Sequence, residues 1–275
     1  MNVLITGGAG YIGSSVSHYL LDKGHQVTII DNLSTGSIKN IPKKATFHKI
    51  DISNRKKLDK IFNKKKYDIV FHFAALINNE ESIEYPKKYF ENNFIKGKIF
   101  IENCIKNKVN KFIYSSTAAV YGNKNKQVNE KDDLKPMSPY SKSKLKLENF
   151  LIKKKKNIRC IILRYFNVAG SDKKLRCGFN VKKGYNLILN LCNAVFKKKI
   201  FIINGGDYNT KDGTTIRDYI HVEDLAKIHL LSANLILKKK MFKILNCGYG
   251  YGFSVKEILK KFNLISKNKV NYKIG

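Results

Sequence analysis

A tyrosine and a lysine stand four residues apart in the segment 138–144, Ser-Pro-Tyr-Ser-Lys-Ser-Lys. Serine is a common helix cap and proline suits a first helical turn, so we expect a helix that presents Tyr140 and Lys144 on one face. An ammonium group near a phenol favours the phenolate and would lower the pKa of Tyr140 from about 10 towards the working pH. The pair therefore predicts a proton-transfer group, although the same spacing is also common on solvated helix faces.

A glycine-rich turn at residues 6–13, Thr-Gly-Gly-Ala-Gly-Tyr-Ile-Gly, follows a strand-like segment and precedes a helical pattern. Glycines allow a tight turn and bring backbone N–H groups close to a diphosphate at the helix N-terminus. Asp31 ends the second predicted strand, where an acid accepts a ribose hydroxyl and repels a ribose phosphate. We therefore expect a dinucleotide site that prefers NAD to NADP, with Asp51 and Ile52 beside the adenine.

The chain has 275 residues and a formal net charge of +32. Its length and its hydrophobic content of 43% suffice for one large domain or two modest ones. The charge invites a nucleic-acid or anionic-membrane partner, but arginine, whose forked guanidinium suits specific phosphate and base recognition, occupies only five positions. We therefore expect a solvated lysine surface with nonspecific polyanion binding at low salt, and no specific nucleic-acid partner.

No apolar run reaches the length of a membrane span, and the N-terminus lacks the layout of a signal peptide. The five cysteines are odd in number and show no paired metal spacing. We expect reduced thiols, no metal site, no membrane association and a cytoplasmic protein.

Short β-branched runs alternate with helical patterns over most of the chain. This alternation predicts an α/β fold with a doubly wound parallel (Rossmann) sheet. The predicted strands are 2–6, 26–31, 45–51, 69–73, 112–116, 159–164 and 242–246. The predicted helices are 14–23, 58–63, 89–106, 138–153 and 222–237. Polar, glycine-bearing stretches at 171–185 and 204–215 indicate loops of a smaller, interleaved domain.

We expect the division into domains to follow these patterns. The dinucleotide-binding domain would comprise 1–170 plus 216–248. An incomplete α/β substrate domain would comprise 171–215 plus 249–275.

Further motifs carry a family resemblance. They are residues 115–122 (Ser-Ser-Thr-Ala-Ala-Val-Tyr-Gly), 163–170 (Leu-Arg-Tyr-Phe-Asn-Val-Ala-Gly), 31–36, 72–75, 91–93 and 212–222. Together with the glycine-rich turn and the Tyr140–Lys144 pair, they resemble the extended short-chain dehydrogenase/reductase family, and within it the nucleotide-sugar 4-epimerases. The resemblance runs over nearly the whole chain. It implies NAD-dependent epimerisation at C4 of a UDP-hexose, UDP-glucose or UDP-galactose, through a transient 4-keto sugar.

The resemblance also implies roles for individual residues. Tyr140 would take the proton of the sugar 4-hydroxyl, Lys144 would hold the nicotinamide ribose and keep Tyr140 anionic, and Thr117 would hydrogen-bond the reacting oxygen. The implied cofactor-binding residues are Gly7, Gly10, Tyr11, Ile12, Gly13, Asp31, Asn32, Ser34, Thr35, Gly36, Asp51, Ile52, Phe73, Ala74, Asn92, Ser115, Tyr140, Lys144 and Tyr165. The implied substrate-binding residues are Thr117, Tyr140, Phe166, Asn167, Asn186, Leu187, Arg217 and Tyr219. Relatives commonly pair through helices that correspond to 89–106 and 138–153, which leaves a homodimer open.

Two alanines, Ala118 and Ala119, follow Thr117, where the similar dehydratases place acidic residues. Without a titratable group there, proton abstraction at C5 lacks its agent and simple epimerisation is favoured, although two alanines would also pack in either enzyme. For Arg217, contact with a diphosphate competes with a surface ion pair to Asp212 or Asp218. His221 is predicted to be a helix cap or a satisfied structural histidine.

Departures from the relatives keep alternatives open. Ile77 and the segment 79–82 differ in a loop near the cofactor and sugar, and the chain stops at Gly275, where relatives continue into a diphosphate-binding segment. We expect either a fragment or a naturally shortened enzyme. The alternatives to UDP-glucose/UDP-galactose epimerisation are an epimerase for an N-acetylated, uronic or pentose UDP-sugar, and an inactive truncated NAD-binding remnant.

Overall fold

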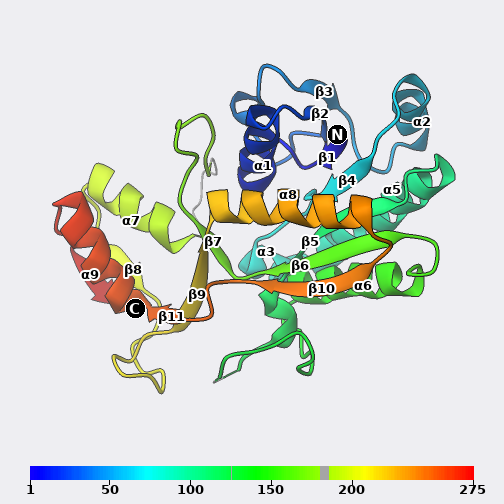
Figure 1. The fold of residues 1–275 in the computed structure, drawn as a ribbon. Helices are drawn as coiled ribbons and strands as arrows, with labels where there is room; N and C mark the ends of the chain where they lie inside the picture. The colour runs from blue at the N-terminus through cyan, green and yellow to red at the C-terminus, as the bar shows by residue number, and fades with distance from the viewer. Residues whose placement is uncertain (125, 180–185) are drawn as a thin grey trace.

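The computed structural model describes residues 1–124, 126–179 and 186–275. Its centre is a seven-stranded sheet in the order β10-β6-β5-β4-β1-β2-β3, and every neighbouring pair is parallel (Figure 1). The strands are β1 (Asn2–Thr6), β2 (Gln26–Asp31), β3 (Thr46–Lys49), β4 (Ile69–His72), β5 (Lys111–Thr117), β6 (Arg159–Tyr165) and β10 (Phe242–Cys247). The order reverses between β1 and β4, which is the kind of switch point where open α/β sheets bind ligands.

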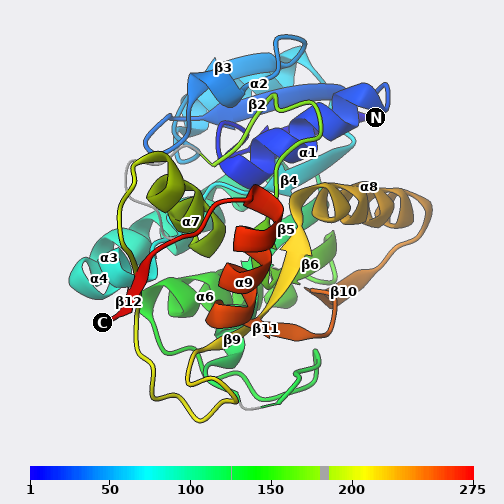
Figure 2. The ribbon, with the colours of Figure 1, turned by 90° about the vertical axis from the view of Figure 1, so that its left-hand side faces the viewer.

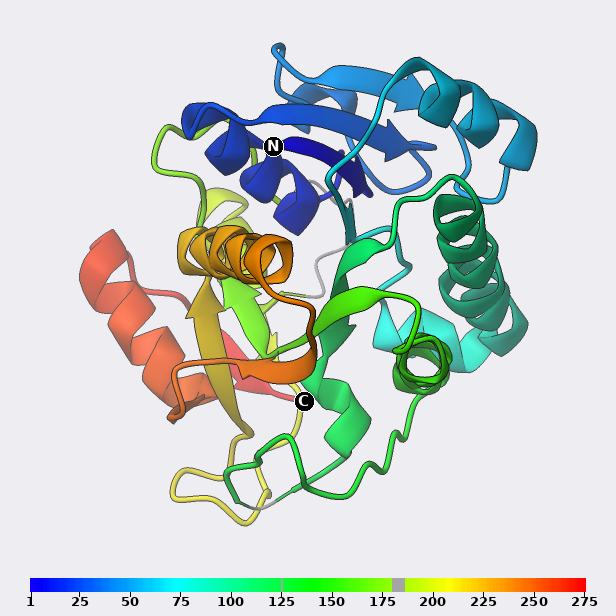
Figure 3. The same cartoon turned by 45° about the vertical axis from the view of Figure 1, so that its right-hand side comes forward.

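Helices cover both faces of this sheet (Figure 3). Helices α1 (Tyr11–Asp22) and α8 (Val222–Lys238) pack on one face, and α2 (Arg55–Lys64), α5 (Lys96–Lys106) and α6 (Pro139–Lys153) pack on the other. Because side chains alternate along a strand, Leu4 joins the core of one face while Val3 and Ile5 join the core of the other. Burial on both sides explains the near-continuous apolar runs from which the parallel sheet was predicted.

The seven predicted strands and five predicted helices are all present: 2–6 and 26–31 agree with β1 and β2 at both ends, and the others have shifted ends. The strand predicted at 45–51 is limited to β3, and the loop predicted at 204–215 is confirmed as irregular. The helix predicted at 89–106 is interrupted: α4 (Pro86–Phe90) and α5 are joined by a π-helical turn at Glu91–Ile95. The polar segment 171–185 is described only as far as residue 179.

A smaller lobe stands at one end of the large sheet, and Figure 2 views the molecule from its side. Its elements are β7 (Asn167–Ala169), α7 (Leu187–Phe196), β8 (Phe201–Ile203), β9 (Ile216–His221), β11 (Gly252–Ser254), α9 (Val255–Ser266) and β12 (Tyr272–Ile274). Strands β11, β9 and β7 form one small sheet, and β12 pairs with β8. Leu191, Phe201 and Leu259 lie in a separate core between α7 and α9. For this region the sequence predicted loops at 171–185 and 204–215 and an incomplete α/β substrate domain, without bounds for its helices and strands.

Within the described residues, no helix combines the length and the apolar character that a bilayer span requires.

The turn between β1 and α1 needs glycine for steric reasons. Gly7 has a φ of +72°, and a Cβ there would lie 2.6 Å from the backbone nitrogen of Ala74. A Cβ on Gly13 would overlap the carbonyl oxygen of Gly7. The close approach of helix and strand therefore depends on the missing side chains.

We expect Gly13→Ala to lower the free energy of unfolding by about 1–3 kcal/mol, because its methyl group meets backbone that cannot rotate away. Gly178→Ala is the matched control, since a Cβ at Gly178 has no heavy atom within 4 Å. The control should change stability by less than about 0.5 kcal/mol. Chemical denaturation of the two variants checks this, and equal stabilities would contradict the packing argument.

Candidate active site

The helix that carries the Tyr140–Lys144 pair begins where the sequence predicts. Ser138 caps α6: its hydroxyl accepts from the backbone N–H of Ser141 at 3.1 Å, and the Ser141 hydroxyl accepts from the N–H of Ser138 at 3.1 Å. Pro139 occupies the first helical position. Tyr140 and Lys144 are thus one turn apart on the same side of a helix whose start is firmly fixed.

Tyr140 meets Thr117 at the end of β5. Burial raises the pKa of the Tyr140 phenol, and a hydrogen bond from the Thr117 side chain lowers it in part. The direction expected from the sequence, a pKa lowered by the neighbouring lysine, is therefore wrong for the protein alone. Desolvation of the phenolate outweighs the favourable interactions because Tyr140 is half-buried instead of lying on a fully solvated face.

Lys144 is a buried cation, only 3% exposed. Its ammonium nitrogen lies 4.6 Å from the ring centroid of Tyr114, and its backbone carbonyl accepts from the Tyr114 hydroxyl at 3.3 Å. Burial lowers the pKa of Lys144 to about 7, while the charge of Glu148 acts in the opposite direction. A lysine with this pKa changes its charge near neutral pH, which an ordinary surface lysine does not.

The glycine-rich turn fits a dinucleotide diphosphate. Gly10 precedes α1 as its cap and provides no side-chain cap to the helix, so first-turn N–H groups face outward for an anion. Asp31 is buried, and its carboxylate accepts from the N–H groups of Ala9 at 3.0 Å and Leu33 at 2.8 Å. Burial raises the pKa of Asp31, and these two hydrogen bonds offset part of that rise. The acid therefore stands beside the turn at the end of β2, as predicted.

Several residues predicted to bind the adenosine half of the cofactor contact one another or line one cavity. Burial would raise the pKa of Asp51, but the hydrogen bonds from Lys96 (2.7 Å) and Ser53 (2.7 and 2.9 Å) outweigh it and lower the pKa to about 2. Asp51 also accepts from Asn32 at 3.2 Å. A cavity of about 260 Å³ is lined by Asn32, Ser34, Leu76, Lys88, Glu91, Asn92 and Lys96. Of the other predicted residues, Thr35 is exposed, Gly36 packs against Ala9, and Ile52 is buried.

The predicted nicotinamide residues lie deeper along the strand ends. Ser115 hydrogen-bonds Tyr165, whose hydroxyl lies 2.6 Å from Nε2 of the buried His229. The ring of Phe73 packs 4.9 Å from the same imidazole. Because Nδ1 of His229 lies 2.8 Å from the carbonyl oxygen of Leu225, it carries the proton, and the Tyr165 hydroxyl donates to Nε2. Tyr165 is therefore held in place by its hydroxyl.

Asn92 and Asn93 have different surroundings. Asn93 is buried, and its side-chain amide forms two hydrogen bonds with the backbone of Leu76. It accepts from the Leu76 N–H at 2.8 Å and donates to the Leu76 carbonyl at 2.9 Å. Asn92 donates to Asn93 at 3.1 Å and lines the cavity described above. Ala74 donates its N–H to the Thr6 hydroxyl at 3.3 Å, which fixes the strand end opposite Gly7.

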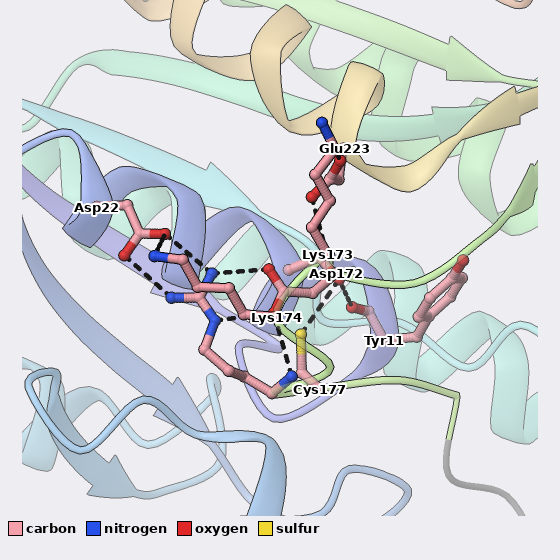
Figure 4. Close-up of polar contacts among 9 residues, drawn as sticks. Tyr11, Asp22, Asp172, Lys173, Lys174, Cys177 and Glu223 are labelled. Atoms are coloured by element: carbon pink, nitrogen blue, oxygen red, sulfur yellow. Dashed lines mark hydrogen bonds and ion pairs between the residues drawn. The ribbon is translucent and has the colours of Figure 1, made fainter.

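A segment from the lobe side is fastened to α1 beside the glycine-rich turn (Figure 4). The Tyr11 hydroxyl donates to the carbonyl of Gly170 at 2.6 Å. Arg176 pairs with Asp172 at 2.7 Å and with Asp22 of α1 at 2.9 Å, and Cys177 lies 3.5 Å from the Ser15 hydroxyl. Tyr11, predicted to contact the cofactor, thus links the turn to this segment through its phenol, whose pKa is raised by burial.

The predicted substrate residues follow β6 and continue through the lobe. Asn167 is exposed and donates to the carbonyl of Asp218 at 3.3 Å, whereas Asn186 caps α7 and donates to Val168 at 3.0 Å. Leu187 begins α7 and packs on the lobe core. Phe166 and Tyr219 are half-buried.

Arg217 and His221 were each predicted with an alternative role. Arg217 is exposed and donates to the carbonyl of Ile216 at 2.9 Å, and no ion pair within the described part of the chain involves it. His221 caps α8 by accepting from the N–H of Glu223 at 3.2 Å, which confirms the structural role predicted for it.

Sequence reasoning missed the buried ion pair between Glu148 and Arg164, whose nitrogen and oxygen atoms are 2.7 Å apart. A signal was available, because Glu148 continues the four-residue spacing of Tyr140 and Lys144. The ion pair of Lys96 with Asp51 left no comparable signal, since it depends on the π-helical turn.

The fold and site define a Rossmann-type dinucleotide-binding protein with a Tyr-Lys-Thr site. Residues 3–248 match the NAD dependent epimerase/dehydratase family, and the chain belongs to this family.

Similar proteins are UDP-sugar epimerases. The UDP-glucose 4-epimerase of Azospirillum brasilense is 39% identical over 98% of this chain and 78% of its own length. The UDP-glucose 4-epimerase of Stenotrophomonas maltophila, solved with NAD and formylated UDP-arabinopyranose, superposes with a TM-score of 0.96 at 32% identity, covering 100% of this chain and 86% of that one. The Bifidobacterium longum enzyme, solved with NAD+ and UDP, has a TM-score of 0.94 at 31% identity, with the same two coverages.

We expect Lys144→Met to raise the free energy of unfolding by about 1–4 kcal/mol at pH 6, because it removes a buried charge at a site that packs well. The pKa of Lys144 is about 7 in the folded protein and 10.5 unfolded, so below pH 7 both states are protonated and the full burial penalty applies. As the pH rises from 7 towards 10.5, Lys144 loses its proton in the folded state before it does so in the unfolded state. The increase in the free energy of unfolding that the variant brings therefore shrinks to less than half by pH 9.

Chemical denaturation at pH 6 and pH 9 checks this prediction. Lys142→Met, at an exposed position of the same helix, is the control and should show no such dependence. If Lys144→Met raised the free energy of unfolding equally at both pH values, the pKa of about 7 for Lys144 would be contradicted.

Proposed function

We propose that this chain is an NAD-dependent UDP-hexose 4-epimerase that interconverts UDP-glucose and UDP-galactose through a transient 4-keto sugar. The observation that carries the proposal is the contact of Tyr140 with Thr117, with Lys144 one turn along α6, at the same carboxyl end of the parallel sheet as the glycine-rich turn. Support comes from the family to which the chain belongs and from relatives and structures of the same activity.

Each residue of the site has a chemical task in this proposal. Tyr140 removes the proton of the sugar 4-hydroxyl and later returns it, and the Thr117 hydroxyl holds the reacting oxygen. Lys144 holds the nicotinamide ribose and, when protonated, favours the Tyr140 phenolate. A bound NAD would supply the hydride chemistry, accepting hydride from C4 and giving it back to the opposite face of the 4-keto sugar, and the positive charge of its oxidised ring would also favour that phenolate.

Separate groups of residues would hold the diphosphate, the adenosine half and the nicotinamide half of the cofactor. Gly7, Gly10 and Gly13 allow the diphosphate to approach the helix, and Asp31 accepts the adenosine ribose hydroxyls. Asn32, Ser34 and Asn92 share one cavity and would contact the adenosine half. Phe73, Ser115 and Tyr165 would form the wall of the nicotinamide half.

The sugar nucleotide would extend from Thr117 towards the lobe. Asn167, Arg217 and Tyr219 lie on or beside strands of the small sheet, and exposed Arg217 has its guanidinium available for a diphosphate. We propose the dinucleotide domain as 1–170 plus 216–248, and 171–215 plus 249–275 as the substrate domain. With these bounds, β7 and β9 of the small sheet belong to the dinucleotide domain, and β11 joins it from the substrate domain. Ala118 and Ala119 have no titratable group, which favours epimerisation over elimination of water.

A second candidate is an epimerase for another UDP-sugar. A similar structure holds a formylated UDP-arabinopyranose, so this site shape accommodates a pentose derivative in that protein. Comparing turnover of UDP-galactose, UDP-N-acetylgalactosamine and a UDP-pentose distinguishes the two candidates. The proposal for UDP-hexose requires UDP-galactose to have the highest kcat/KM.

We also propose a cytoplasmic homodimer. Reduced thiols, here all unpaired among the described residues, and an NAD-dependent reaction suit the cytoplasm. Phe90 of α4, Ile83 of the preceding α3 (Asn79–Glu84) and Tyr85 between the two helices are exposed large hydrophobic side chains, and both helices contact α6. Size-exclusion chromatography with light scattering tests the dimer directly.

We expect Tyr140→Phe to lower kcat by about 10²–10⁴-fold, because the variant lacks the proton-transfer group. NAD binding should change little, since the hydroxyl is proposed to act on the sugar. Conversion of UDP-galactose to UDP-glucose, followed by product analysis, and calorimetric NAD binding check the two halves of this prediction.

Tyr272→Phe is the matched control because Tyr272 is exposed on the terminal strand β12. It should leave both measurements unchanged. An unchanged kcat in Tyr140→Phe would overturn the role of Tyr140, whereas an inactive wild-type chain that binds NAD would support the inactive remnant.

A further inference from the structure

We propose that Glu148 is a positioning residue for this site: through Ser116 it fixes the strand end that carries Thr117, and it places a carboxylate one helical turn beyond Lys144. The inference rests on the proposed function in one respect, that Lys144 and Thr117 serve the reaction. It adds a residue to the site that lies beneath the groups that would touch substrate.

Glu148 and Arg164 form an ion pair that is almost completely buried, with residue exposures of 0% and 1%. Arg164 Nη2 donates to Glu148 Oε2 at 2.7 Å, and Arg164 Nε lies 3.2 and 3.3 Å from the two carboxylate oxygens. The Ser116 hydroxyl donates to Oε1 of the same carboxylate. Removing either charge would leave the other buried without its partner.

The pair holds the chain on both sides of Thr117. Ser116, the preceding residue, is attached through the carboxylate of Glu148. Tyr121, at the end of the short 3-10 turn Ala118–Tyr121 that follows, accepts from Arg164 Nη1 at 2.9 Å. Its hydroxyl donates in turn to Asn246 at 2.7 Å. Thr117 therefore lies in a segment whose two flanks depend on one buried ion pair.

The same carboxylate acts on Lys144. The groups that face the ammonium are the Tyr114 ring of β5 and the neutral His72 of β4, with Tyr140 one turn earlier on α6. Burial lowers the pKa of His72 to about 3, with a further contribution from Lys144, so the imidazole carries no charge at neutral pH. Glu148 is the group whose negative charge favours protonated Lys144.

Stability alone gives a poor account of this arrangement, because a buried ion pair is often no more stabilising than well-packed apolar side chains. The Glu148–Arg164 pair hydrogen-bonds residues on both sides of Thr117, and Glu148 places a negative charge one helical turn beyond Lys144. Apolar side chains could do neither. A purely structural role for Glu148 would predict lost stability with no selective effect on Lys144.

The test measures the Lys144 titration directly in Glu148→Gln. Protein labelled with ¹³Cε-lysine shows the Lys144 signal by NMR, and its disappearance in Lys144→Met assigns it. We expect the titration of Lys144 in Glu148→Gln to move to lower pH by at least about one unit, the scale for loss of a nearby opposite charge. Glu148→Asp, which keeps the charge, should restore most of the wild-type titration.

Turnover provides the second readout. In Glu148→Gln the alkaline limb of kcat should move to lower pH together with the Lys144 titration, while KM for the UDP-sugar changes less than threefold. Glu102→Gln is the matched control: it removes an equal charge from a half-buried surface site on α5, where Glu102 pairs with Arg55 at 3.5 Å and Lys98 at 3.8 Å. Its pH profile should match that of the wild type.

A folded Glu148→Gln protein with an unchanged Lys144 titration would overturn the inference. If that variant does not fold, the double variant Glu148→Gln/Arg164→Gln, which leaves no unpaired buried charge, is compared with Arg164→Gln, which keeps the carboxylate. The inference then requires Lys144 to titrate at lower pH in the double variant than in Arg164→Gln, and equal titrations would overturn it. An inactive wild-type enzyme would defeat the proposed function, but the NMR titration would still decide the role of Glu148.

Discussion

Desolvation along one face of α6 is the constraint on which the site depends. A phenol, an ammonium and a carboxylate, at Tyr140, Lys144 and Glu148, follow each other at four-residue spacing and enter the fold. Each charged form loses hydration there, so each must be compensated by a specific neighbour. Arg164 compensates the carboxylate, the carboxylate and the Tyr114 ring compensate the ammonium, and Thr117 bonds the phenol.

This constraint explains why the protein alone holds Tyr140 in its neutral form. A phenolate at this depth needs more positive charge than a lysine with a pKa of about 7 provides. In the proposed reaction the positive ring of an oxidised cofactor would add such a charge, so a bound hydride acceptor would favour the Tyr140 phenolate. Coupling the base to the cofactor in this way would protect a reactive sugar alcohol from deprotonation without oxidation.

The sequence predicted most of what is local or periodic. Apolar runs such as 2–6 and 159–164 identified the parallel sheet because both faces of these strands are buried, and Ser138-Pro139 identified the start of α6. The direction of the Tyr140 pKa could not be predicted, since it depends on burial by residues distant in sequence. The lobe also escaped prediction: β7, β9 and β11 are too short for a clear pattern, and their pairing is set by tertiary contacts. For α9 the capping box of Ser254 and Glu257 was a readable signal that remained unused.

The π-helical turn at Glu91–Ile95 shows how a local irregularity serves the same site. A π-turn adds a residue to a helical turn and is less favourable than α-helix, so it persists where the displaced side chains have a task. Here it separates α4 from α5 and directs Asn93 inward onto Leu76, while Asn92 lines the cavity that also contains Asn32 and Ser34. Lys96, the first residue after the turn, reaches Asp51 across that edge at 2.7 Å. The irregular turn is therefore the physical link between the helix beside α6 and the adenosine edge of the sheet.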